Sequence, residues 1–160
     1  MENSRSSLAV QDFYPDDFAH CFGCGRLNPH GHQIKTRWEG DETVTRFTPQ
    51  PFHIAVPGYV YGGLIASLMD CHGMATASAI AERNAGRAIG EGPAQRYVTA
   101  SLKVDYLKPT PLGPELQVRG RAKEIGARKI IVEVSLHVAG EVTARGEIVA
   151  VPVPEGIMRK

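Results

Sequence analysis

Two glycines and an acid occur at a spacing that suits catalysis at a carbonyl group. Gly62 and Gly63 directly precede an apolar stretch, and Asp70 follows seven residues after Gly63. If the stretch is helical, the free amides of the glycines lie at its positive end and can stabilise a developing oxyanion. Asp70 then lies two turns further along the same face. We expect its carboxylate to present water or a nucleophile to a bound carbonyl.

Residues 61–84 carry the long helical pattern that must position these groups. At about 100° per residue, one stripe should pack on a sheet. Its members are Leu64, Ile65, Leu68, His72, Ala75, Thr76 and Ala79. Because His72 lies in this stripe, we expect a buried, hydrogen-bonded histidine with a structural role.

The opposite face of the predicted helix is small and nearly free of charge. It carries Gly63, Ala66, Ser67, Asp70, Gly73 and Ala77. A solvent face normally carries Glu, Lys and Arg, so we expect a second contact to cover this one. The prediction is a homodimer or homotetramer. The alternative is a glycine-rich loop end followed by a solvated acid.

Alternating apolar and polar residues predict strands on both sides of the helix. The expected strands are residues 32–38, 43–47, 97–107, 115–125, 129–138 and 142–151. The last four read as an antiparallel meander. The fold class is therefore α+β, with one long helix lying on a curved antiparallel sheet. We expect a disordered tail over residues 1–12 and a single domain over residues 13–160.

Several motifs together resemble the PaaI-like group of hotdog-fold acyl-CoA thioesterases. Tyr61-Gly62-Gly63 stands where that family has His-Gly-Gly, Asp70 occupies its acid position, and Thr99 matches a polar residue on the next strand. Residues 106–113 are similar to its strand exit, and residues 21–25 with 28–31 to a front segment of some members. The resemblance implies a hotdog fold and an acyl-CoA substrate.

The resemblance also implies roles for these residues. The Gly63 amide, with Gly62, polarises the thioester carbonyl. Asp70 acts as general base or as nucleophile, and Thr99 with Ser101 orients the water or the carboxylate. Sites of this family usually form between two subunits. Ser67, on the same helix face as Asp70, and Ser101 are expected to contact the substrate.

Tyr61 departs from the family pattern. A tyrosine hydroxyl can donate a hydrogen bond but is poorly suited to proton transfer near neutral pH. This argues against a dehydratase, which relies on a histidine in this fold. It leaves two alternatives open: a thioesterase, or a non-catalytic protein that binds acyl-CoA.

Three cations are candidates for binding the phosphates of coenzyme A. Arg128 and Lys129 follow a predicted turn, and Lys108 lies near a strand exit. Bunched cations suit phosphates, but a solvated hairpin end carries the same residues.

Composition excludes other classes of function. The net charge of +1 gives no sign of nucleic-acid binding. We found no apolar run near the roughly 20 residues of a spanning helix and no signal peptide, and therefore expect a cytoplasmic protein without a membrane partner. We also expect no cofactor.

The cysteines raise one further alternative. Cys21 and Cys24 form a CxxC that His30 and His32 could complete as a zinc site. Without a second CxxC, we expect reduced thiols in a turn and no metal.

Overall fold

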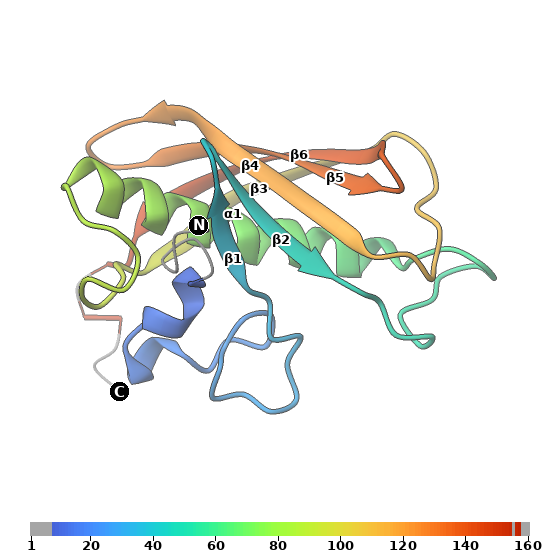
Figure 1. The fold of residues 1–160 in the computed structure, drawn as a ribbon, viewed down its shortest axis with the longest axis horizontal. Coiled ribbons are helices and arrows are strands. Elements are labelled where there is room, and N and C mark those ends of the chain that lie inside the picture. The colour runs from blue at the N-terminus through green and yellow to red at the C-terminus, as the bar shows by residue number, and fades with distance from the viewer. Residues whose placement is uncertain (1–7, 155, 158–160) are drawn as a thin grey trace, which may run out of the picture.

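A computed structural model describes residues 8–154 and 156–157 of the 160-residue chain. In this part of the chain one antiparallel sheet curves around one long helix (Figure 1). The helix is α1 (Gly62–Asn84), and the strands are β1 (Thr36–Glu39), β2 (Glu42–Phe47), β3 (Tyr97–Tyr106), β4 (Leu116–Ile125), β5 (Ile130–Val138) and β6 (Glu141–Pro152). The predicted α+β class and the expected helix and strands are confirmed.

The strand order corrects the predicted meander. The sheet runs β1-β2-β4-β5-β6-β3, so β3 lies at the far edge beside β6 and does not neighbour β4. Tight turns join β4 to β5 and β5 to β6, whereas residues 107–115, with three prolines, connect β3 to β4. A connection of this length can cross the sheet, because only a short loop forces two antiparallel strands to be neighbours.

Helix α1 packs its predicted stripe on the sheet. Every stripe member is buried. The sheet approaches so closely that a Cβ at Gly73 would lie 3.0 Å from Ile148, and one at Gly146 would lie 2.9 Å from the Met69 sulfur. Gly73 and Ala77 were expected on the second face, but both are buried inside this chain.

By length and composition alone, α1 could cross a membrane. The prediction that no apolar stretch approaches the length of a membrane-spanning helix was therefore wrong. Within the fold, 78% of its apolar window is buried, as in the core helix of a globular domain.

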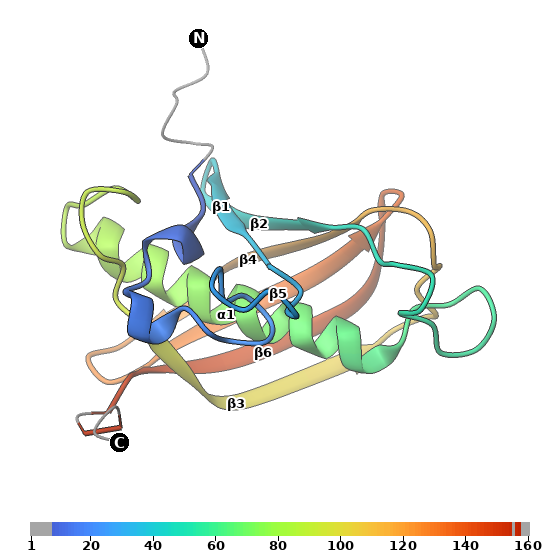
Figure 2. The same ribbon diagram turned by 90° about the horizontal axis from the view of Figure 1, so that it is seen from below.

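The N-terminal segment forms a third layer on the side of the helix away from the sheet, below α1 in Figure 1 and in front of it in Figure 2. It contains two 3-10 helices, η2 (Val10–Phe13) and η3 (Asp16–Phe18). The side chain of Gln11 is buried and exchanges hydrogen bonds of 2.9 and 2.8 Å with Thr36 at the start of β1. The predicted disordered tail is thus wrong for residues 8–12, because Gln11 pairs with a residue 25 positions away and no local pattern reveals that contact. Residues 1–7 lie outside the described part.

Candidate active site at the edge of the sheet

Asp70 projects from α1 toward the edge strand β3. It is half-buried, and Thr99 Oγ1 donates a hydrogen bond to its Oδ1. The structure thus brings together two predicted site residues that are 29 positions apart in the chain. The hydroxyl orients the carboxylate and leaves its second oxygen available to a water or a substrate.

A β-bulge in β3 creates this contact. Thr99 pairs with Ala150 of β6 and Ser101 pairs with Val149, so Ala100 is an extra residue. Because neighbouring strand residues point to opposite faces, the bulge turns Thr99 toward the helix and Ser101 toward the outer face. The structure does not bring Ser101 to Asp70. Simple alternation had placed both residues on one face, since a bulge leaves no mark in the polarity pattern.

Helix α1 begins with free amides, as predicted. Its first residue is Gly62, and no side chain caps the start. The first amides of a helix lack intrahelical partners and carry partial positive charge. The Tyr61 ring lies directly across Gly63, where any Cβ would collide with ring atoms and the hydroxyl. Tyr61 therefore holds a hydroxyl group beside the predicted oxyanion site.

Tyr106 is a site residue that the sequence reasoning missed. Its hydroxyl donates a 2.7 Å hydrogen bond to the Gly62 carbonyl, and it therefore connects the end of β3 to the start of α1. Burial raises the pKa of Tyr106, and the neighbouring Tyr61 adds to the effect. The sequence did contain a sign of this role, because Tyr106 begins the segment that resembles the strand exit of the family. The alternation of the strand assigned it to the apolar face instead.

The Ser67 side chain bonds to the backbone of its own helix. Its hydroxyl donates a 2.9 Å hydrogen bond to the Gly63 carbonyl one turn earlier. This contact uses the serine's only donor and supports the first turn of the helix. The role that the structure favours for Ser67 is holding the glycine turn.

Gly63 and Asp70 lie too far apart within one chain to act on the same carbonyl carbon directly. Seven residues separate them, which is roughly 10 Å at the helical rise of about 1.5 Å per residue. The exposed strand β3 lies beside both, because it contacts Asp70 through Thr99 and Gly62 through Tyr106. A single chain therefore places the free amides of the helix start and the Asp70 carboxylate at two separate points along one open edge of the sheet.

His72 belongs to a separate network inside the core. Its Nδ1 lies 2.7 Å from the Thr45 hydroxyl and its Nε2 lies 3.1 Å from the Thr43 hydroxyl. Complete burial lowers the pKa of His72 to about 3, so the ring stays neutral at physiological pH. The predicted structural role is confirmed.

The three predicted cations do not gather at one place. Lys108 forms a 3.1 Å ion pair with Glu141 at the end of β3 where Tyr106 lies. Arg128 and Lys129 are exposed at the turn between β4 and β5, beyond the level of Thr99. Within one chain the two groups therefore lie at opposite ends of the sheet.

The histidines and the CxxC separate in space. His30 and His32 line a cavity of about 470 Å³ at the end of β2, with Phe22, Phe47 and His53 among its other walls. The thiols of Cys21 and Cys24 instead turn toward Cys71 on α1. The zinc site considered from sequence, with His30 and His32 as ligands, does not form.

Comparison with known proteins identifies the family to which this fold and these residues belong. The model of the thioesterase superfamily matches residues 57–147, more than half of the chain, which include the helix start, Asp70 and Thr99. The chain belongs to the thioesterase superfamily. A solved thioesterase superfamily protein from Shewanella loihica is 45% identical, with a TM-score of 0.66 over 87% of this chain and 98% of that one. The predicted hotdog fold is thereby confirmed.

Part of the chain also matches curated relatives. Acyl-coenzyme A thioesterase THEM4 of Mus musculus is 34% identical over 95 residues, and that of Xenopus laevis is 30% identical over 94. Each alignment covers 59% of this chain, which spans about a third of the length of these relatives. A Streptococcus mutans protein solved with acetyl CoA is 18% identical, with a TM-score of 0.55 over 75% of this chain and 88% of that one.

Proposed function

We propose that this protein hydrolyses an acyl-CoA thioester to the free acid and coenzyme A. The observation that carries the proposal is the half-buried Asp70 carboxylate, held by Thr99 at the open edge of the sheet that also presents the free amides of Gly62 and Gly63. The names of the curated relatives support the same substrate class. Because this chain spans about a third of the length of those relatives, their names support the activity of the shared domain.

The proposed mechanism assigns one task to each group. The Gly63 amide, aided by the helix start, donates a hydrogen bond to the oxyanion that forms when the thioester carbonyl is attacked. Asp70 removes a proton from the attacking water, or attacks the carbonyl itself and forms an acyl anhydride that water then hydrolyses. On either route the intermediate collapses by breaking the acyl C–S bond, and the CoA thiolate leaves and takes up a proton. The Thr99 hydroxyl fixes the carboxylate, and Tyr106 fixes the glycine turn through the Gly62 carbonyl.

A second copy of the chain would complete the site. Most side chains of β3 are exposed, including Leu102 and Tyr106, and an unpaired edge with apolar side chains is suited to pairing. Antiparallel pairing of β3 with its copy would bring the Tyr106 end of one chain toward the Thr99 end of the other. Gly63 of one subunit and Asp70 of its partner could then act on one carbonyl. The dimer and the cytoplasmic location both remain predictions.

The second candidate function is acyl-CoA binding without turnover. The observation that favours it is Tyr61, which replaces the family's histidine and covers Gly63 with its ring. A ring in that place could hold a ligand and yet keep the carbonyl from the amide.

One experiment separates the two functions. The purified chain is given short, long and aromatic acyl-CoAs, and thiol release is followed with a thiol reagent. Hydrolysis of at least one class, abolished when Asp70 is replaced, supports the thioesterase. Tight binding of an inert acyl-CoA analogue without release of thiol from any substrate would instead establish the binding protein.

A further inference from the structure

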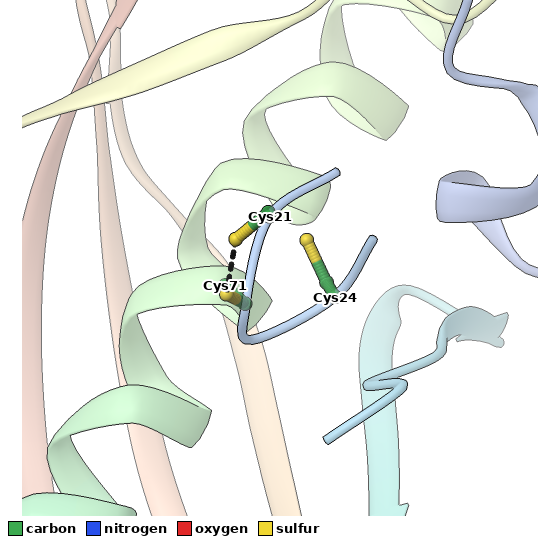
Figure 3. A group of neighbouring side chains, drawn as sticks. All are labelled: Cys21, Cys24 and Cys71. Atoms are coloured by element: carbon green, nitrogen blue, oxygen red, sulfur yellow. Dashed lines mark hydrogen bonds between the residues drawn. The ribbon is translucent and has the colours of Figure 1, made fainter. Parts of the chain in front are cut away.

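Three cysteines from two distant parts of the chain converge beneath α1. Cys21 and Cys24 come from the N-terminal loop and Cys71 from the helix, and Figure 3 shows the three sulfurs facing one another. All three sulfur atoms lie within 4.8 Å of one another, and none is in a disulfide. In the described part of the chain the group contains no histidine or carboxylate.

The spacing of one sulfur pair matches an edge of a zinc tetrahedron. With Zn–S bonds of about 2.3 Å, two thiolates on one zinc ion lie about 3.8 Å apart. The sulfurs of Cys21 and Cys71 are 3.8 Å apart, and the third sulfur lies within 4.8 Å of both. A disulfide would require about 2.05 Å, so the two thiols are not covalently joined.

The loop that carries the CxxC brings its thiols against the helix. The loop is a tight turn, closed by a 2.7 Å hydrogen bond from the Gly25 amide to the Cys21 carbonyl. A Cβ at Gly23 would collide with the Cys71 sulfur, so only glycine lets the loop approach the helix this closely.

A buried hydroxyl in the N-terminal layer lacks a partner. Tyr14 is almost fully buried, and within the described residues its hydroxyl has no hydrogen-bond partner. Tyr14 and Cys24 belong to the same buried core cluster. An orphaned buried polar group calls for an explanation, and an ordered water would supply one.

We propose that Cys21, Cys24 and Cys71 bind a thiophilic cation of the Zn²⁺ type, with a water completing the tetrahedron. Three thiolates with no hard oxygen ligand from a carboxylate select such an ion over Mg²⁺ or Ca²⁺. Cys24 and Cys71 are buried, whereas Cys21 is partly exposed and gives the ion a path of entry.

The ion would join the N-terminal layer to the helix. Cys71 follows Asp70 directly, but a step of about 100° around the helix turns its side chain toward the loop and away from β3. The site is therefore structural: it fixes the N-terminal segment to the helix that carries Asp70. Its binding free energy would add to the stability of the fold.

The test uses the full chain, kept reduced and freed of metal with a chelator. Co²⁺ is added as a spectroscopic substitute for Zn²⁺. We expect thiolate-to-cobalt charge-transfer absorption that saturates at one ion per chain and disappears when Zn²⁺ is added. Zn²⁺ should also raise the thermal midpoint and protect all three thiols from alkylation.

Variants assign the ligands. Cys21→Ser, at the most exposed position, should weaken Co²⁺ binding at least about 100-fold, because loss of groups that merely support a ligand already costs about 10–100-fold. Cys24→Ser and Cys71→Ser should do the same, with circular dichroism to confirm folding. The matched control is His32→Ala in the same loop, which should still bind one ion.

Three results would overturn the proposal. They are the absence of the charge-transfer band in reduced wild-type protein, unchanged affinity in folded Cys21→Ser, and loss of binding in His32→Ala.

Discussion

Asp70 and His72 are two residues apart on α1 but have opposite surroundings. Both ring nitrogens of His72 have hydroxyl partners, and the ring is sealed between helix and sheet. Asp70 has one described partner, Thr99, at an edge that none of the other described strands covers. A polar group whose bonds are satisfied in the core stabilises the fold, whereas one left open at an edge is available for chemistry.

Replacing Asp70 tests the reactive half of this comparison and should have the largest effect. Asp70→Asn keeps the shape and removes the charge, so turnover of acyl-CoA should fall at least about 100-fold, as for loss of acid–base catalysis. Binding of an inert analogue should change little. The control is Asp105→Asn, an exposed acid on β3 with a 3.6 Å ion pair to Lys103, which should be nearly silent. Turnover of Asp70→Asn within a few-fold of wild type would remove the carboxylate from the mechanism.

Crowding the His72 network tests the structural half. A Cβ added at Gly120 of β4 would lie 2.8 Å from His72 Nε2 and 3.2 Å from the Thr43 hydroxyl. Gly120→Ala should therefore lower the free energy of unfolding by about 1–3 kcal/mol, the usual cost of overpacking a core. Urea denaturation measures this loss. Turnover per folded molecule should stay within about twofold, and a large fall in turnover would show that the two networks are coupled.

Removing the partner of Asp70 should have a smaller effect on turnover. Thr99→Val deletes the hydroxyl that holds the carboxylate. A hydrogen bond to a charged group contributes about 1.5–3 kcal/mol, and for this half-buried pair we expect the lower end, on the order of a 10-fold fall in kcat. Thr99→Ser should restore most of it. Ser101→Ala, on the opposite face of the bulge, is the control. Equal losses in Thr99→Val and Ser101→Ala would contradict the assignment of the faces.

The predicted phosphate contacts should give the smallest effect. Replacing Arg128 and Lys129 together by alanine should raise KM for acyl-CoA a few-fold and change kcat less, because contacts far from the carbonyl contribute uniform binding. Lys108→Ala should do less, since Lys108 is already paired with Glu141. A pantetheine thioester, which lacks the nucleotide, should not respond. An equal response with both substrates would disprove the phosphate role.

The sequence by itself determined the elements and singled out the candidate reactive residue. Periodicity located α1 and all six strands within a few residues, because side-chain patterns of helix and strand are local. Missing charge around Asp70 marked it as unusual, and the position of His72 in the apolar stripe indicated its burial. Gly62 and Gly63 predicted a helix start with free amides. Each of these signals depends on residues close together in the chain.

Tertiary structure alone decided which elements meet. No local pattern places β3 beside β6, marks Ala100 as a bulge, or shows that Thr99 faces Asp70 while Ser101 turns away. Likewise, the sulfur of Cys71 lies next to that of Cys21, 50 positions away in the chain. His30 and His32 are nearer to Cys21 in sequence but line a separate cavity. Such contacts follow from the packing of whole layers, in which a single extra strand residue reverses the direction of every side chain before or after it.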